Sequence, residues 1–476
     1  MNKKYAIFFS ILAAALFCRV YFAVHFPVTL DEAWSNMVGR LPMEGVIKEV
    51  KADIHPPLVY LVHKFFTVSR TELGIRWLFA LLGFLSIFYL VRFINAAPAT
   101  LLLLGFSAYL ISEGAIARMH AFSLFFSSAA CYYYARTFER ENAADFALLA
   151  LFSILALYNF YPFGALVAAF IAVYLLFRKS SVSKPAFYLY AFCAVILFSL
   201  PLLYFLNPVS VGSYTPENPV TIPTGAILAY LPFALAFSEH LLKFSEIRGM
   251  NIVYFLLLFS LIAPAIVSGL RNKDGDLRLR LSAWLALVSL AIVFAVSLKL
   301  PKVLLSSKYI AWAYPLYAYM FIKGLESFPV RIKYFILSAV LAANFAALYS
   351  ALEHNPENWR EAAAFVAQNE KADDVILFDT GHMRYPFQFY YSGTGKIEGL
   401  PAGKPVFEPE PYMVYNRIWL VLAHDWKRSG GYRDLIAEKA TLAGKYPFRD
   451  IKILLFELNS GKNAAADRPP DRPLRR

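Results

Sequence analysis

The chain has 476 residues, a mean hydropathy of +0.51, and 59% hydrophobic against 17% charged residues. This composition excludes an ordinary soluble globule, and the length excludes a protein with one membrane anchor, which leaves a multi-span membrane protein. The formal net charge of +13 does not indicate nucleic-acid binding, because the basic residues lie in short runs between apolar segments. That distribution is typical of membrane orientation signals.

The first apolar run follows Lys3 and Lys4 and ends near Val24. We interpret it as a retained helix, because no small-x-small sequence that a signal peptidase would cleave closes the run. A membrane-crossing helix needs about 20 apolar residues, and the runs of roughly this length predict about eleven spanning helices. They lie near residues 5–24, 74–94, 97–112, 120–135, 144–161, 163–177, 186–206, 251–270, 281–298, 309–325 and 332–352.

The basic residues between these runs predict the orientation of the protein. With the N-terminus in the cytoplasm, every basic cluster falls on the cytoplasmic side, as the positive-inside rule requires. These residues are Arg92, Arg136, Arg140, Arg178, Lys179, Lys184, the run 271–280, Lys323, Arg331 and Lys333. The outer face of the plasma membrane then receives residues 25–73, 113–119, 207–250, 299–308 and everything after about 353. Two of these segments, 55–66 and 226–244, are apolar yet end in charge, which predicts helices along the membrane surface.

The composition after residue 353 is that of a soluble domain. A helix is expected at 357–370, strands at 374–379, 417–423 and 451–458, and a second helix near 434–443. This alternation predicts a small α/β layer with a largely parallel sheet. We therefore expect a transmembrane domain over 1–352, an extracytoplasmic α/β domain over 353–458, and a disordered polar tail over 459–476.

The first expected outer loop contains two adjacent carboxylates, Asp31 and Glu32, shortly after the first span. Ionised groups beside hydrocarbon are costly, so acids in this place predict a chemical use. A carboxylate there can act as a general base between a lipid-borne substrate and a water-borne acceptor. The structural alternative has equal weight: both are solvated loop acids, and Asp31 caps a helix through Ala33 to Val38.

Asp53 and His55 add oxygen and nitrogen donors to the same loop. Together with Asp31 or Glu32 they would suffice for a divalent cation, which is the one cofactor that the sequence suggests. The two prolines that follow would start a helix and hold both donors at its N-terminus. The favoured alternative is that His55 caps this helix and Asp53 is a favourable charge near its positive end.

Three cations lie at the outer ends of expected spans and are candidate phosphate ligands. Arg118 and His120 precede the fourth span, and Lys308 stands beside Tyr309 before the tenth. Arginine offers a bidentate fork to phosphate, and lysine offers a point charge. The alternative is snorkelling to the interface, an account that suits Arg76 better than these three. Other histidines lack ligand-like spacing, and we interpret them as structural: His63, His240, His354, His382 and His424.

These motifs together resemble the bacterial GT-C glycosyltransferases of family 39, the group of dolichyl-phosphate-mannose protein mannosyltransferases and lipid A aminoarabinose transferases. The resemblance covers nearly the whole chain, including the extracytoplasmic domain. It rests on Asp31-Glu32-Ala33, Asp53-x-His55-Pro56-Pro57-Leu58-x-Tyr60-Leu61, Ala117-Arg118-Met119, Lys308-Tyr309 before Pro315, Asn358-Trp359-Arg360-Glu361-Ala362-Ala363 and Asp374-Val375-Ile376-Leu377-Phe378.

The resemblance implies a GT-C-like helical membrane fold and inverting transfer of a sugar. The donor would be a polyprenyl-phosphate-linked sugar, and the acceptor an envelope lipid, glycan or protein at the outer face of the plasma membrane. Asp31 would be the catalytic base and Glu32 its neighbour. The remaining site residues would contact the substrate: Asp53, His55, Tyr60, Arg118, His120, Lys308 and Tyr309. Asp53 and His55 could instead be metal ligands.

The chain departs from the family pattern at several positions. Many relatives have glutamate where this chain has Ile116 and arginine where it has Lys308. Relatives also carry Thr-His-Tyr where the sequence here is Asn159-Phe160-Tyr161. The missing histidine at Phe160 weakens a metal site, and the lysine weakens bidentate phosphate binding.

Two other functions remain open on the sequence. A transporter or flippase of lipid-linked sugars would concentrate polar residues at mid-membrane and show repeat symmetry, and neither feature is visible here. An O-antigen ligase or polymerase would rely on arginines and histidine in a large late loop, where this chain offers Arg248 and His240. The transfer with Asp31 as base needs no nucleotide sugar, because the chain lacks a cytosolic domain that would hold one.

Overall fold

The computed structural model describes residues 3–95, 98–181, 185–206, 234–238, 262–268, 270–271, 276–297, 307–353, 357–400, 410–412, 414–423 and 430–458. The chain divides into two compact units. The helical unit comprises Met1–Phe26 and Val38–His354, and the sheet unit comprises Pro27–Met37 and Asn355–Arg476. Most of the predicted surface helix at 226–244 and the first part of the predicted span at 251–270 lie outside the described residues.

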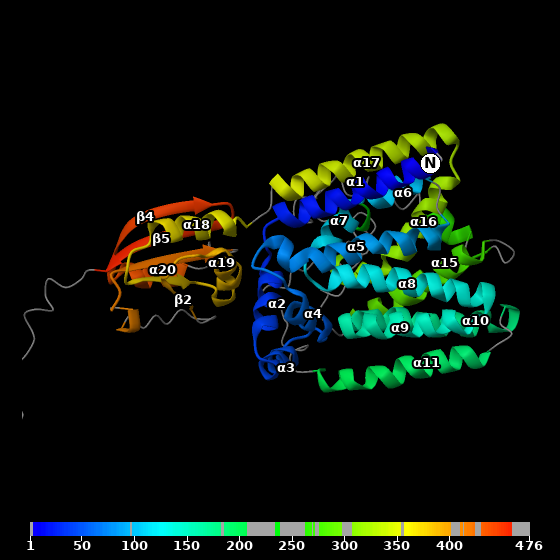
Figure 1. Cartoon of the computed structure of the whole chain (residues 1–476), viewed down its shortest axis with the longest axis horizontal. Coiled ribbons are helices and arrows are strands. Elements are labelled where there is room, and N and C mark those ends of the chain that lie inside the picture. The colour runs from blue at the N-terminus through cyan, green and yellow to red at the C-terminus, as the bar shows by residue number, and fades with distance from the viewer. Residues whose placement is uncertain are drawn as a thin grey trace, which may run out of the picture. The chain divides into compact units, whose positions relative to one another are not determined.

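The helical unit consists of long helices and short connecting ones (Figure 1). Five helices of the described residues are long and apolar enough to cross a membrane: Ala6–His25, Glu72–Ile94, Pro185–Tyr204, Leu277–Val296 and Val330–Glu353. A multi-pass membrane protein is therefore confirmed, whereas the count of about eleven spans stays a prediction. The helices are α1 (Lys3–His25), α2 (Leu30–Arg40), α3 (Met43–Ala52), α4 (Leu58–Phe66), α5 (Glu72–Ile94), α6 (Pro98–Gly105), α7 (Ala108–Ala115), α8 (Met119–Arg140), α9 (Ala143–Asn159), α10 (Gly164–Ser181), α11 (Pro185–Ser199), α15 (Leu277–Ser297), α16 (Tyr314–Glu326) and α17 (Val330–Glu353), with 3-10 turns η1 (Tyr161–Phe163), η2 (Leu200–Tyr204) and η5 (Ser307–Ala313).

The run expected as one span at 97–112 is two helices, α6 and α7. The side chain of Ser107 accepts a hydrogen bond from the backbone N–H of Leu110 over 3.3 Å and so caps the start of α7. A capping serine satisfies one of the backbone donors that a new helix leaves without an intrahelical partner. The apolar composition of the run had concealed this break.

The centre of the helical unit is formed by α5, α7 and α8. Most of α8 is buried, and its middle is built from small residues such as Ser127, Ser128, Ala129 and Ala130, which allow close approach of neighbouring helices. A Cβ on Gly83 of α5 would lie 2.4 Å from the carbonyl oxygen of Gly114, so the backbones of α5 and α7 touch directly. This contact fixes the end of α7 that leads into Arg118.

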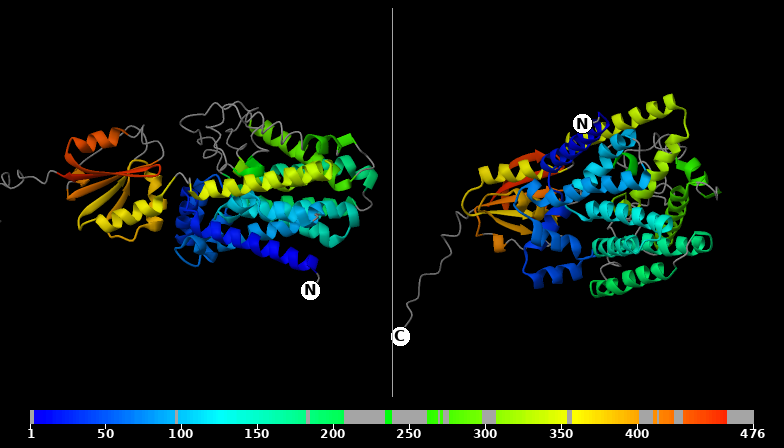
Figure 2. Two further views of the ribbon diagram at one scale, coloured as in Figure 1. Left: turned by 90° about the horizontal axis from the view of Figure 1, so that it is seen from above. Right: turned by 45° about the vertical axis from the view of Figure 1, so that its right-hand side comes forward.

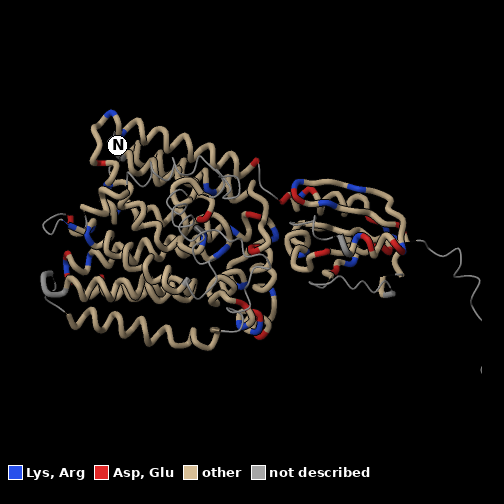
Figure 3. The backbone as a smooth tube through the Cα atoms, turned by 180° about the vertical axis from the view of Figure 1, so that it is seen from behind, with Lys and Arg blue, Asp and Glu red and all other residues tan. Residues whose placement is uncertain are grey.

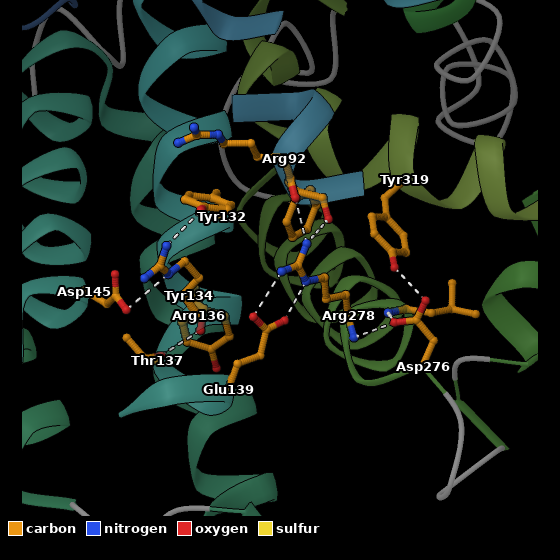
Figure 4. Close-up of polar contacts among 12 residues, drawn as sticks. Arg92, Tyr132, Tyr134, Arg136, Thr137, Glu139, Asp145, Asp276, Arg278 and Tyr319 are labelled. Carbon is orange, nitrogen blue, oxygen red and sulfur yellow. Dashed lines mark hydrogen bonds and ion pairs between the residues drawn. The ribbon is translucent and has the colours of Figure 1, made fainter. Parts of the chain in front are cut away.

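At the far end of α8, Arg278 joins three helices (Figure 4). Its Nε and Nη2 donate to the two carboxylate oxygens of Glu139 over 2.6 and 3.0 Å. Its Nη1 donates to the carbonyl oxygens of Arg92 and Phe93, over 2.7 and 2.8 Å, at the end of α5. The last carbonyls of a helix lack intrahelical partners, so this arginine completes α5 while it ties α15 to α8. We call this group, with Asp276 and Tyr319, the Arg278 clamp.

Asp276 extends the clamp to a fourth helix. Its Oδ1 accepts the backbone N–H of Arg278 over 3.0 Å at the start of α15, and its Oδ2 accepts the hydroxyl of Tyr319 in α16 over 2.8 Å. Figure 3 shows charged residues gathered mostly toward the helix ends of this unit. The orientation of these ends with respect to the cytoplasm stays a prediction.

The sheet unit contains a five-stranded sheet in the order β2-β1-β3-β5-β4. Its strands are β1 (Asp374–Phe378), β2 (Lys396–Gly399), β3 (Arg417–Ala423), β4 (Ala440–Phe448) and β5 (Ile451–Leu458). α18 (Trp359–Asn369) and α19 (Arg384–Tyr390) pack on one face, and α20 (Gly430–Ala437) covers the other. The left view of Figure 2 shows these layers.

The prediction of a largely parallel sheet is wrong for one half of it. β1 pairs in parallel with β2 and β3, but β5 pairs antiparallel with both β3 and β4. The helix expected near 434–443 ends at Ala437, and the residues from Ala440 form β4 instead. A tight turn with Asp450 in the left-handed region (φ 53°) then joins β4 to β5 as a hairpin, which requires antiparallel pairing.

Candidate active site

Asp53 ends α3 and forms a local network with the two motif residues that follow it. Its Oδ1 accepts the backbone N–H of Ile54 over 2.7 Å, and its Oδ2 lies 3.1 Å from Nδ1 of His55 and accepts the hydroxyl of Tyr60. Burial raises the pKa of Asp53, but the hydrogen bond and charge of His55, with Tyr60 and Arg118, outweigh it and lower the pKa to about 2. The carboxylate is therefore ionised and orients the imidazole.

The proposed capping role of His55 is wrong. The N-cap of α4 is Pro57, which makes no side-chain capping hydrogen bond. Proline suits such a position because its missing N–H would have no partner there. His55 instead has its Nδ1 on Asp53, an arrangement that fixes the ring so that Nε2 faces away from the carboxylate.

Arg118 lies beside this network, although more than fifty residues separate the two motifs. It stands at the N-cap of α8 with 4% of its surface exposed. It is hydrogen-bonded to the side chain of Tyr60 and interacts electrostatically with Asp53. Burial raises the pKa of the Tyr60 hydroxyl, so this group stays protonated as a hydrogen-bond donor to Asp53. α4 thus presents Tyr60 as the bridge between carboxylate and guanidinium.

Two buried side chains hold the backbone on either side of Arg118. Nε2 of His63, one turn along α4 from Tyr60, lies 3.0 Å from the carbonyl oxygen of Ala117. Nδ2 of Asn159, at the end of α9, donates to the carbonyl oxygen of Met119 over 2.9 Å. The sequence predicts a structural role for His63 and marks Asn159 only as a departure from the family pattern. Their link to Arg118 depends on tertiary contacts with backbone oxygens, which sequence spacing does not reveal.

Tyr309 brings η5 to the same place. Its ring stacks on His55 with centroids 6.3 Å apart at 12°, and on Phe160 with centroids 5.7 Å apart at 16°. Nζ of Lys308 lies 5.4 Å from the centre of the Tyr309 ring. Phe160 therefore completes an aromatic stack here. We call the assembled group the Arg118 cluster; it comprises Asp53, His55, Tyr60, Arg118, Lys308 and Tyr309.

Two further side chains, Tyr161 and His120, are neighbours of the Arg118 cluster. Tyr161, missed by the sequence interpretation, interacts electrostatically with Asp53. His120 is buried, and its Nδ1 lies 2.8 Å from Oε2 of Glu113 in α7, with which it forms an ion pair when protonated. The structure therefore gives His120 a carboxylate partner, and its predicted substrate contact stays a prediction.

α2 crosses the boundary between the two units at Val38, and Asp31 and Glu32 lie in its first turn, within the sheet unit. The backbone N–H of Thr29 donates to Oε2 of Glu32 over 3.0 Å, while the N–H of Glu32 points to Oγ1 of Thr29 at 3.4 Å. This reciprocal pair is a capping box. The capping residue is therefore Thr29 and not Asp31. The buried Glu32 has a structural task, whereas Asp31 is half-buried and is the second residue of the helix.

The donors for a metal ion are few. Within the described ranges, no group of three or more His, Cys, Asp or Glu side chains lies close enough together to hold an ion. Asp53 and His55 supply two donors, fewer than the three protein ligands of a typical catalytic zinc site. A divalent cation at this position stays a prediction.

Comparisons with known proteins agree with the motifs. Residues 54–205, which contain His55, Tyr60 and Arg118, match the family model described as Dolichyl-phosphate-mannose-protein mannosyltransferase. No curated protein sequence matches the chain.

The structure is similar to ArnT from Cupriavidus metallidurans in the apo state, with a TM-score of 0.64 and 12% identity over 95% of this chain and 98% of that one. For ArnT from the same organism bound to undecaprenyl phosphate, the TM-score is 0.60 and the identity 10%, over 96% of this chain and 98% of that one. The resemblance to the GT-C group is confirmed, and at these identities the solved structures show the shared fold.

Proposed function

We propose that this multi-pass membrane protein, which has the fold of ArnT, is a glycosyltransferase that uses a polyprenyl-phosphate-linked sugar. The observation that carries the proposal is the Arg118 cluster, in which cations from three separate segments converge on one aromatic and carboxylate network. Two facts support the donor class: the family model covers three of the six cluster residues, His55, Tyr60 and Arg118, and one structure with this fold holds undecaprenyl phosphate. The sugar would be a hexosyl or pentosyl group.

The cluster suits the leaving group of such a transfer. When the bond between the sugar and the lipid phosphate breaks, negative charge grows on the phosphate oxygens, and preorganised cations lower the free energy of that state. Arg118 is the strongest candidate ligand, because its planar guanidinium can bind two phosphate oxygens at once. Lys308 adds a point charge, and His55 adds a donor when it is protonated.

Asp31 is our proposed general base. It would accept the proton of the acceptor hydroxyl while that oxygen forms the new bond to the anomeric carbon and the lipid phosphate departs from the opposite side. Its support is its place shortly after α1 and its half-buried position in the first turn of α2, where Glu32 has the capping task. Direct displacement of this kind inverts the anomeric configuration.

The transport alternative is less well supported. A flippase would place ionisable groups at mid-membrane along a translocation path. Here the cluster residues come from the α3–α4 connection, the N-terminus of α8 and the turn before α16, which are helix ends. We place this end at the outer face of the plasma membrane, where the acceptor would be an envelope lipid, glycan or protein.

The deciding experiment is mass spectrometry of envelope glycans and lipids from a strain that lacks this protein. Loss of one glycosyl modification, restored by the wild-type chain and not by Asp31→Asn, is the expected result. Accumulation of a lipid-linked precursor on the cytoplasmic side would contradict the proposal and favour transport. Isosteric Asp31→Asn removes only the base, so membrane levels of the protein should not change.

A further inference from the structure

The segment 27–37 belongs to the sheet unit, although along the chain it lies between α1 and α3 of the helical unit. It includes the first turn of α2, the capping pair and Asp31. The remainder of the sheet unit begins at Asn355, more than three hundred residues later. Long-range contacts must therefore hold the segment in place.

Two tyrosines of α19 make these contacts. The backbone N–H of Val28 donates to the hydroxyl of Tyr390 over 2.7 Å. The ring of Trp34 lies 5.0 Å from the ring of Tyr385, at an angle of 58°. Between these points Leu30 packs on the hydrophobic core that α18 and α19 form with the sheet. The contacts lie on both sides of the proposed base.

Neighbouring side chains hold α19 in turn. The guanidinium of Arg360 in α18 lies 5.7 Å from the centre of the Tyr390 ring, and Nη2 of Arg384 donates to the hydroxyl of Tyr385 over 3.1 Å. Phe387, between the two tyrosines, is fully buried and packs edge-on against Phe378 of β1 at 5.2 Å. The two tyrosines therefore stand on a part of the unit that is fixed to its core.

We propose that the sheet unit sets the position of Asp31, with Tyr385 and Tyr390 as positioning residues. This inference rests on the proposed function, since it assumes that Asp31 is the base. The bond to Val28 lies just before the capping box, so it fixes where α2 begins, and the helix geometry then fixes the direction of Asp31. A base displaced by about 1 Å from its acting position can cost about 10²-fold in rate.

The role predicts a specific kinetic effect. The cations proposed to bind the donor phosphate lie in the helical unit, and α19 does not carry any of them. Loosening the segment should therefore lower kcat and leave the KM for donor unchanged. If a variant were simply less well folded, the amount of active protein would fall, but kcat per folded molecule would stay the same.

The test uses adjacent tyrosines of the full-length protein in detergent. Tyr390→Phe removes the hydroxyl that binds Val28, and Tyr385→Leu removes the ring contact to Trp34. Tyr391→Phe is the matched control, because the Tyr391 hydroxyl bonds Glu370 within the sheet unit and not the segment. Each variant is measured by hydrogen exchange of peptides from residues 27–37 and by transfer kinetics with a polyprenyl-phosphate-linked sugar, alongside Asp31→Asn.

We expect faster exchange in the segment and a kcat lowered by about tenfold for Tyr390→Phe and Tyr385→Leu, with both quantities near wild type for Tyr391→Phe. Unchanged exchange, or faster exchange with unchanged kcat, would overturn the inference. If Asp31→Asn is inactive in that case, the proposed base stands and only the positioning role falls. If Asp31→Asn keeps wild-type activity, the proposed base itself is wrong.

Discussion

Arg118 and Arg278 both stand at helix ends of the helical unit, yet their surroundings differ in kind. The guanidinium of Arg278 meets both oxygens of Glu139 and two main-chain carbonyls, so its charge and its hydrogen-bond donors serve the fold. Arg118 meets the neutral hydroxyl of Tyr60 and the field of Asp53, whose oxygens already accept other donors. In this comparison the partners of the two cations, more than their burial or place on a helix, distinguish the structural role of Arg278 from the phosphate-binding role that we propose for Arg118.

Replacement of Arg118 should have the largest effect on catalysis. Arg118→Ala should lower the transfer rate by about 10²- to 10³-fold, the usual cost of losing one group that stabilises developing charge. Arg118→Lys should also be impaired, because the bidentate fork is lost. Rates at saturating and limiting donor measure this effect. Near-native transfer rates for both variants would contradict the phosphate-binding role of Arg118, and with it the functional difference between Arg118 and Arg278.

His63 tests whether the backbone beside Arg118 must be held. His63→Leu removes the contact to the Ala117 carbonyl and should lower kcat by about tenfold, because small displacements of a binding group are costly. His63→Gln keeps a hydrogen-bond donor and should recover part of the rate. Equal loss in both variants at equal melting temperature would contradict the positioning role.

Arg278→Ala should act on stability and not on chemistry. The change removes the donor that Glu139 and two main-chain carbonyls share. A lost hydrogen bond to a charged group lowers the free energy of unfolding by about 1.5–3 kcal/mol, and by less at a partly exposed site such as this one. We expect a lower melting temperature with an unchanged rate per folded molecule. Glu139→Gln in the Arg278→Ala background should add little further loss, because one interaction is removed twice.

The contribution of the Asp53 carboxylate to stability should depend on pH only under acidic conditions. The folded-state pKa of about 2 lies below the ordinary value of 3.8, so the stabilising contribution is complete above pH 3.8 and is lost as pH falls through about 2. The melting-temperature difference between wild type and Asp53→Asn should therefore be the same at pH 7 and pH 5. It should narrow only below about pH 4. A difference that already narrows between pH 7 and pH 5 would contradict this pKa.

The smallest effect is expected at Lys308. The resemblance places arginine here in many relatives, and the lysine approaches the cluster from above the Tyr309 ring. Lys308→Arg should therefore keep the wild-type rate or exceed it, because arginine also stacks on aromatic rings. Lys308→Ala serves as the control and should raise the KM for donor.

The sequence predicted those parts of the structure that local pattern determines. Strong apolar runs located β1, β3 and β5, and the motifs located the members of the Arg118 cluster. β4 escaped because its residues alternate between exposed and half-buried and include Gly444 and Pro447, which weaken any strand pattern. His63 and Asn159 escaped because their partners are carbonyl oxygens of another helix end, and only the folded chain brings these together.

The Arg278 clamp also has a mechanical consequence. α8 has 22 residues, so at 1.5 Å per residue about 33 Å separate its clamped end from Arg118 at its start. α5, α15 and α16 are tied to it at that end, while His63 and Asn159 hold the backbone on either side of Arg118 at the other, so hydrogen bonds hold α8 at both ends. The position of Arg118 therefore depends on polar contacts at two places about 33 Å apart along one helix.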